Sequence, residues 1–462
     1  MDIAVEKATP VKRAKRIPAT RRERWAWYFY DFGNSAYAAV VLLAVYSAYF
    51  KGQVVGGSEG TRLWGLSVGI AMLAVAVIAP ILGTIADFSG SKKKFLFFFT
   101  SLAVVFTAAL FFVMPGDILT GMLFFILAEI GYRAAQVFYN ALLPEIATPE
   151  EMGKISGNGW AFGSLGGIVC LLIVLVLITT VGGTTVVRFA FLITAVFYLA
   201  SAIPVFLWLR ERAEPQPLPR GDNYFKVAFK RLGNTFRAVR KYKEFVKFII
   251  AFLIYNDGIM MALDFAAIIG AVLFGMNQQQ LIIFMIIVQI ASVGGAYLFG
   301  ILADRWTSKL SLIISLILMI AAVIWMLFVQ QIAIFFIIGG LAGFALTGVQ
   351  SVSRTLVGQY APAGKSAEFF GFFEVGGRTS SFIGPAVYGL IAAEAAIIFG
   401  LRGMDPLTAE QMGIRVAIVS IAVFLIIGLI LLLNVRQPQL KADAEQETEA
   451  AAAGAGVRFH DD

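Results

Sequence analysis

The sequence predicts an all-α membrane protein whose twelve transmembrane helices form two pseudo-symmetric six-helix bundles. Three observations predict it: the composition, the number of long apolar stretches, and a repeat between the two halves of the chain. Of the 462 residues, 59% are hydrophobic and 14% are charged, whereas about 25% of residues in soluble domains are charged. A water-soluble fold could not cover this much apolar surface, so we expect lipid to cover part of it.

The apolar stretches have the length that a membrane requires. A helix needs about 20 mostly apolar residues to cross a hydrocarbon core of about 30 Å. The stretches lie near residues 27–50, 63–86, 94–114, 118–141, 155–180, 188–209, 246–270, 279–302, 309–329, 332–357, 369–393 and 412–434.

The distribution of Lys and Arg predicts the orientation. Short loops rich in these residues are retained on the cytoplasmic side of the membrane. Of the 37 Lys and Arg residues, 29 lie in the two terminal segments and in loops on the same side as the termini. The four in the opposite loops are Lys51, Arg62, Arg188 and Arg402. We therefore expect both termini in the cytoplasm and the chain in a bacterial inner (plasma) membrane.

Composition divides the chain into five parts. We expect a basic cytoplasmic arm (1–26), an N-terminal six-helix bundle (27–209), a cytoplasmic linker (210–245), a C-terminal six-helix bundle (246–434) and a disordered cytoplasmic tail (435–462). The arm lacks the apolar core of a cleavable signal peptide. In the linker, apolar residues recur at helical spacing among many Lys and Arg, which indicates an amphipathic helix on the anionic leaflet. A calmodulin-type or nucleic-acid target is the weaker interpretation, and no nucleic-acid partner is expected.

An internal repeat relates the two halves. Four positions recur after 217 or 218 residues, in loops that share one design. Duplicated six-helix halves joined by a long basic loop are typical of secondary transporters that bind solute between the halves. The matched pairs are Gly83 with Gly300, Asp87 with Asp304, Pro144 with Pro362, and Gly153 with Gly371.

The repeated loops carry a known motif. The segments GTIADFSGSKK and GILADRWTSK resemble the G-x-x-x-D-R-x-G-R-K signature of the major facilitator superfamily, with Phe88 and Ser91 in place of Arg in the first copy. Each aspartate is predicted to cap a neighbouring helix as part of a gate, with a basic side chain as countercharge; a topology anchor is the alternative. The predicted gating residues are Gly83, Asp87, Gly90, Lys92, Gly300, Asp304 and Arg305.

Five further strings lie along the chain: WYFYDFGNSAY at 27–37, VFYNALLPEIA at 137–147, ISGNGWAFGSLGG at 155–167, YNDG at 255–258 and FFGFFEVGGRTSSFIGP at 369–385. These strings resemble the vacuole-effluxer (autophagy-related permease) branch of that superfamily. Vacuolar members of the branch export neutral amino acids, so the resemblance implies amino acid efflux.

Charged residues inside the spans predict the solute pathway. A charge at membrane depth costs about 3 kcal/mol or more unless it has a partner, a water-filled cavity or a function. In the stretch 118–141, four polar residues follow spacings of 4, 3 and 4, so they share one helical face. The residues predicted to line a solute or proton pathway are Asp31, Asn34, Glu129, Arg133, Gln136, Asn140, Asn256, Asp257, Asp264, Gln350, Arg354, Glu374 and Arg378.

These charges suggest a zwitterionic solute. Its carboxylate would face Arg133 or Arg354, and its ammonium group would face a buried acid, namely Asp257, Asp264 or Glu129. Glu129 and Asp257 are the candidates to carry a coupling proton, because burial disfavours the charged form of a carboxyl group. The alternative is that the pairs four residues apart, Glu129 with Arg133 and Glu374 with Arg378, only neutralise each other within a helix.

The residue inventory argues against catalysis. The single cysteine, Cys170, lies in an apolar stretch, and the single histidine, His460, is two residues from the end. A Ser-His-Asp or zinc hydrolase is therefore excluded, and we expect no enzyme, metal or cofactor. The expected partners are a small-molecule solute, the lipid bilayer and a candidate coupling proton. A solute-sensing receptor, an uncoupled facilitator and a channel are the alternatives to a secondary active transporter.

Overall fold

The computed structural model describes residues 19–147, 151–212, 241–361 and 381–437, with isolated residues between 226 and 240 and between 369 and 377. These parts of the chain are helical, and twelve of their helices are long and apolar enough to cross a membrane. The predicted all-α class with twelve transmembrane helices is confirmed. The predicted residues Glu374 and Arg378, together with the terminal segments 1–18 and 438–462, lie outside the described residues.

The N-terminal half begins with an irregular span. Its α1 is followed by a π-helical segment at Ala38–Ala44, the short α2, and a second π-helical segment at Phe50–Val55. Thr20 caps α1 and exchanges hydrogen bonds with Glu23, which satisfies the first backbone N–H groups of the helix. The helices of this half are α1 (Arg21–Tyr37), α2 (Tyr46–Tyr49), α3 (Gly57–Ser89), α4 (Lys92–Ala109), α5 (Ile118–Ala141), α6 (Leu143–Ile146), α7 (Met152–Val181) and α8 (Thr184–Trp208).

The C-terminal half contains a broken span. Helix α10 ends at Asp264, and the chain changes direction at Phe265 before α11 begins. The eleventh span was predicted near 369–393, but α16 continues to Leu401 because the Ala-rich segment after residue 391 favours a helix. The helices are α10 (Lys243–Asp264), α11 (Ala266–Phe274), α12 (Gln278–Arg305), α13 (Ser308–Phe328), α14 (Ile332–Tyr360), α16 (Ile383–Leu401) and α17 (Pro406–Leu433).

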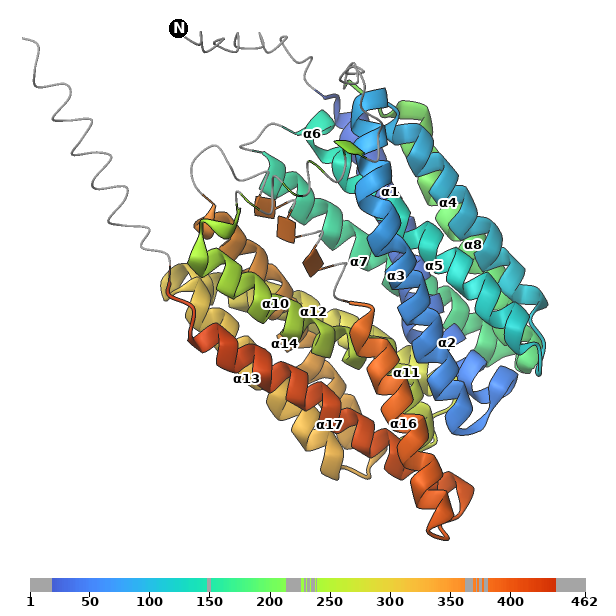
Figure 1. Ribbon diagram of the computed structural model, residues 1–462. Helices are drawn as coiled ribbons and strands as arrows, with labels where there is room; N and C mark the ends of the chain where they lie inside the picture. Colours follow the sequence, from blue (N-terminus) through green and yellow to red (C-terminus); the bar gives the residue numbers. More distant parts are fainter. Residues whose placement is uncertain are drawn as a thin grey trace, which may run out of the picture.

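The two halves repeat one packing scheme (Figure 1). Helix α1 packs on α7 and α8, as α10 packs on α16 and α17. Helix α4 packs on α5, as α13 packs on α14. Between the halves, α3 contacts α16 and α12 contacts α7, which are again equivalent pairs. The structure therefore has the pseudo-symmetry that the sequence repeat predicts.

The halves meet at one face of the molecule. We call the face where α1 begins and α17 ends the terminal face, and the opposite face the distal face. At the distal face, Lys51 of the N-terminal half pairs with Glu410 of the C-terminal half at 2.6 Å between Nζ and Oε1. The indole N–H of Trp64 also donates to the carbonyl oxygen of Asp264 at 2.8 Å. Figure 1 shows the two bundles approaching each other near α2, α11 and α16.

At the terminal face, the ion pairs among the described residues join parts of the same half. In the N-terminal half they join α1 to the residue before α7 and to the segment after α8, and they join α4 to α6. None of these pairs crosses to the C-terminal half. Among the residues that the structure describes, the ion pair that links the halves therefore lies at the distal face. The pairs are Arg24 with Glu151, Lys92 with Glu145, and Arg212 with Glu23 in the N-terminal half, and Glu244 with Lys247 in the C-terminal half.

Close helix packing depends on particular glycines. A Cβ atom at Gly295 of α12 would overlap the backbone carbonyl of Phe344 in α14, whereas one at the adjacent Gly294 would lie 3.7 Å from the Phe344 ring. We expect Gly295→Ala to destabilise the protein by about 1–3 kcal/mol, because backbone atoms cannot move aside locally. Gly294→Ala is the matched control and should be neutral or slightly stabilising. Melting temperatures in detergent measure both, and equal values for the two variants would contradict the packing.

Candidate functional site

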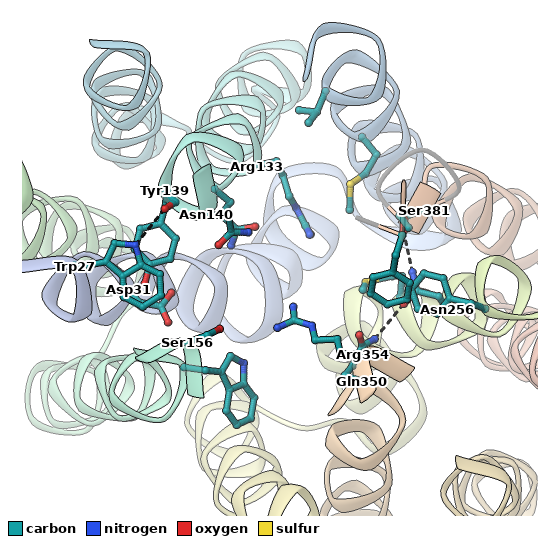
Figure 2. A pocket seen from close by; sticks show the side chains of 18 residues that line it. Trp27, Asp31, Arg133, Tyr139, Asn140, Ser156, Asn256, Gln350, Arg354 and Ser381 are labelled. Atoms are coloured by element: carbon teal, nitrogen blue, oxygen red, sulfur yellow. Dashed lines mark hydrogen bonds between the residues drawn. The ribbon is translucent and has the colours of Figure 1, made fainter. Parts of the chain in front are cut away.

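A cavity of about 280 Å³ lies between the two halves. Figure 2 shows its polar side chains converging from both sides. The cavity is lined by Trp27, Asp31, Met72, Val75, Arg133, Gln136, Tyr139, Asn140, Ser156, Trp160, Phe252, Asn256, Met260, Gln350, Arg354, Phe373, Gly377 and Ser381. Of the residues predicted to line a pathway, Asp31, Arg133, Gln136, Asn140, Asn256, Gln350 and Arg354 are in this lining.

Helix α5 supplies one cation together with its counterion. Arg133 donates from Nε to Oε1 of Glu129 at 2.7 Å, one helical turn away. Glu129 is fully buried, and Tyr37 of the first span lies beside its carboxylate. The intrahelical ion pair considered from the sequence is therefore present. It also fixes an arginine that lines the cavity, so neutralisation and a role in the cavity do not exclude each other.

Two further charges come from opposite halves. Asp31 lies on α1 and Arg354 lies on α14, and Figure 2 shows them on opposite sides of the cavity. The two groups attract each other electrostatically, and the Asn34 amide lies beside the Asp31 carboxylate. A small solute with one positive and one negative group would find a complementary charge for each group here.

A wall of neutral polar groups completes the C-terminal side. Gln350 of α14 donates from Nε2 to Oδ1 of Asn256 on α10 at 3.0 Å. Asn256 donates from Nδ2 to the Ser381 hydroxyl at 3.2 Å. These groups join α10, α14 and the segment before α16 along one side of the cavity (Figure 2).

Aromatic rings line the cavity at positions that the sequence analysis missed. Trp27 stacks on Tyr139 with ring centroids 4.3 Å apart and donates its indole N–H to the Tyr139 carbonyl oxygen at 3.1 Å. Helical spacing could have found them, because Trp27 precedes Asp31 by four residues and Tyr139 follows Gln136 by three. The aromatic residues of the lining are Trp27, Tyr139, Trp160, Phe252 and Phe373.

Several predicted residues lie outside the lining in this conformation. Glu129, Asp257 and Asp264 are almost completely buried, with at most 3% of each residue exposed. Asp264 lies at the end of α10, near enough to Arg133 and Glu129 to interact with both electrostatically. Asn34 is buried and accepts a hydrogen bond from the Tyr198 hydroxyl at 3.0 Å. Among the described residues, the acid that lines the cavity is therefore Asp31.

The predicted gating residues lie at the terminal face. Gly90 ends α3 in the left-handed region, with φ of 55°. Lys92 is paired with Glu145 of its own half, and Arg305 is exposed at the end of α12. A Cβ atom at Gly83 or at its repeat partner Gly300 would meet nothing within 4 Å. The side chains of Asp87 and Asp304 lie outside the described parts of the structure.

A glycine of α7 makes room for the Asp31 carboxylate. A Cβ atom at Gly163 would overlap Oδ2 of Asp31, whereas one at Gly157 of the same helix would meet nothing within 4 Å. We expect Gly163→Ala to displace the carboxylate and weaken solute binding roughly tenfold, since charged hydrogen bonds contribute about 1.5–3 kcal/mol. Gly157→Ala is the control, and binding isotherms on the purified variants provide the measurement. Unchanged affinity in Gly163→Ala would show that Asp31 does not need its present position.

Two helical bundles around a polar central cavity define a membrane transporter of the major facilitator type. Solved structures that share this fold include the following two. One is a bacterial homolog of the human lysosomal transporter Spinster, described as inward-facing and occupied (TM-score 0.68, 15% identity, 91% of this chain and 96% of that chain). The other is the nucleoside transporter NupG (TM-score 0.66, 13% identity, 90% and 100%).

The chain belongs to the family described as "Vacuole effluxer Atg22 like", whose sequence model matches residues 63–445. It is 29% identical over 429 residues to the uncharacterized MFS-type transporter YxiO of Bacillus subtilis (90% of this chain, 95% of that protein). It is 26% identical over 406 residues to autophagy-related protein 22 of Yarrowia lipolytica (69% of each). These relatives are transporters and not enzymes, and the chain is an integral membrane protein.

Proposed function

We propose that this transporter carries a small zwitterionic solute of the amino acid class by alternating access. The observation that carries the proposal is the position of Asp31 and Arg354 on opposite halves of one cavity (Figure 2). An ammonium group facing Asp31 and a carboxylate facing Arg354 would bridge the halves. The bridged solute would then favour closure of the terminal face around it, because closure shortens both charge contacts.

The proposed direction is efflux from the cytoplasm. We infer that the terminal face is cytoplasmic, since 29 of the 37 Lys and Arg residues lie on that side. The described basic residues of the linker support this inference: Lys226 and Arg240 are exposed, while Val227 and Val239 are buried, which suits a helix on an anionic leaflet. The Lys51–Glu410 pair joins the halves at the distal face, and a cavity closed on that side is the state that would load a cytoplasmic solute for export.

Proton coupling is part of the proposal. Glu129 is buried beside Arg133, and Arg133 borders the cavity. A solute carboxylate that faces Arg354 and also attracts Arg133 would compete with Glu129 for Arg133, and a proton would then be the alternative partner of the Glu129 carboxylate. Solute binding and protonation would in this way depend on each other, as thermodynamic linkage requires.

Reconstituted counterflow tests the proposal. Purified protein in liposomes loaded with an unlabelled amino acid should take up the same labelled amino acid with saturable kinetics. A pH gradient across the liposome membrane should then drive net movement, and Glu129→Gln should remove that dependence while exchange continues. Stabilisation and exchange by sugars or organic acids alone would contradict the zwitterion assignment. Ligand binding without flux would indicate a receptor, and currents that do not saturate would indicate a channel.

A further inference from the structure

The hydrogen bonds on the C-terminal side of the cavity form a continuous chain that ends on the backbone. Gln350 contacts Asn256 at 3.0 Å, Asn256 contacts Ser381 at 3.2 Å, and the Ser381 hydroxyl contacts the carbonyl oxygen of Gly377 at 2.6 Å. All four residues line the cavity. Asn256 and Ser381 are each only 3% exposed, so water does not compete freely for their bonds.

The backbone end fixes the direction of every bond in the chain. A carbonyl oxygen can only accept, so the single hydroxyl proton of Ser381 must be donated to Gly377. Ser381 Oγ can then only accept, so the Asn256 atom beside it must be the NH₂ group. The amide oxygen of Asn256 therefore faces Gln350, which must present its own NH₂ group.

The donor-to-acceptor direction of these bonds determines which amide atom of Gln350 is available to a solute in the cavity. Its NH₂ group is engaged by Asn256, which leaves Oε1 as the acceptor of the same amide. Within the described residues, no group donates a hydrogen bond to Gln350 Oε1. Arg354 lies four residues further along α14, so the two side chains are neighbours on one helical face. Helix α14 thus presents a cation and a neutral acceptor side by side.

We propose that Gln350 is a specificity-determining residue, which accepts a hydrogen bond from a donor group on the atom next to the solute carboxylate. The inference rests on the proposed function, because it assigns that carboxylate to Arg354. In an α-amino acid the donor is the ammonium group, and in an α-hydroxy acid it is the hydroxyl group. Acids without such a donor leave Oε1 unsatisfied when they displace water from it, and they bind more weakly by about tenfold to a hundredfold.

Three small solutes and three variants test the assignment. L-alanine, L-lactate and propionate have the same carbon skeleton and carry ammonium, hydroxyl or hydrogen at the α-carbon. L-lactate and propionate are both anions, so their comparison does not include the attraction of Asp31 for an ammonium group. Gln350→Met removes the acceptor at similar length, and Gln350→Glu retains an acceptor. Gln359→Met is the matched control, because Gln359 lies on α14 outside the cavity lining and donates to Ser308.

Binding isotherms on the purified, full-length protein provide the readout. We expect Gln350→Met to weaken L-alanine binding at least tenfold and to bring the lactate-to-propionate affinity ratio close to one. Gln359→Met should bind all three solutes with the affinities of the parent protein. Gln350→Glu should still bind lactate more tightly than propionate, although its negative charge weakens the binding of both anions. The inference is overturned if Gln350→Met binds L-alanine with the affinity of the parent protein, or if the substitution lowers the affinity for all three solutes by the same factor. If the parent protein binds none of the three, the proposed function fails and this inference fails with it.

Discussion

Replacing Lys51 with Gln is expected to move the transporter from its distal-closed conformation toward a distal-open one. The Lys51–Glu410 pair joins the two halves at 2.6 Å, and each side chain is only 11% exposed. Removal of the cation leaves Glu410 without its countercharge at a closed interface, which is far more costly than the loss of an exposed pair. We expect a penalty of about 2 kcal/mol for the closed state, or roughly 30-fold in the ratio of the two conformations.

Distances between spin labels would measure this shift without any solute. Gln53 and Leu407 are exposed on the distal face of opposite halves, and Cys170→Ala removes the single native cysteine. Labels at Gln53→Cys and Leu407→Cys should give mainly short distances in the parent protein and a larger long-distance population in Lys51→Gln.

The distal face offers a matched control for this experiment. Arg62 and Glu59 form an ion pair of 2.7 Å, but both belong to α3 and both are substantially exposed. Arg62→Gln should leave the distance distribution unchanged, since exposed pairs contribute at most about 1 kcal/mol and this one does not join the halves. The combined Lys51→Glu and Glu410→Lys exchange should restore much of the short-distance population. Equal shifts in Lys51→Gln and Arg62→Gln would mean that the pair does not hold the distal face closed.

The fold could be predicted because the membrane imposes a simple length rule. Each span must satisfy its own backbone hydrogen bonds, so apolar stretches of about 20 residues become helices. The rule gives less information where helices are interrupted. The break at Phe265 lies where the halves are in contact, because Trp64 bonds to the carbonyl oxygen of Asp264, and the π-helical segment Ala38–Ala44 packs on α10, α11 and α12 of the other half. No local pattern in the sequence identifies such long-range contacts.

Helical spacing predicted part of the lining for a similar reason. Arg133, Gln136 and Asn140 share one face of a regular helix, and all three line the cavity. Asn256 and Asp257 are adjacent, so their side chains point about 100° apart and cannot both face the same space. Only Asn256 lines the cavity. Spacing places residues around a helix, but it does not say how far along the helix the cavity extends.

Asp264 shows this second limitation. It follows Asn256 by eight residues, so it lies about 80° around α10 and about 12 Å further along the helix. It is buried at the distal end of that helix, where the halves are in contact. Which end of the cavity is closed depends on the conformation of the transporter, and one sequence encodes both conformations. The sequence can therefore nominate Asp264 as a pathway residue without saying when solute or solvent reaches it.

The second large effect is expected at Arg354. Arg354 and Asp31 are charges of opposite sign that line the cavity from opposite halves. Arg354→Gln should weaken the binding of a zwitterionic amino acid by about 100-fold, because the solute carboxylate would lose a charged partner in a partly dehydrated site. Arg402→Gln removes an exposed cation from a loop of the distal face and should have no effect.

Asp31→Asn should distinguish the contribution of the solute ammonium group to binding from that of the solute carboxylate. The substitution should weaken the binding of zwitterions to a similar extent, because it removes the attraction between Asp31 and the ammonium group. It should not weaken the binding of a simple carboxylate such as propionate, because it also removes the repulsion between Asp31 and the carboxylate. Arg354→Gln should weaken both classes, because both carry the carboxylate. Isotherms for L-alanine and propionate on the two variants give four affinities. If Asp31→Asn and Arg354→Gln change the two solutes in the same way, the charges act on the stability of the cavity and not on separate groups of a bound solute.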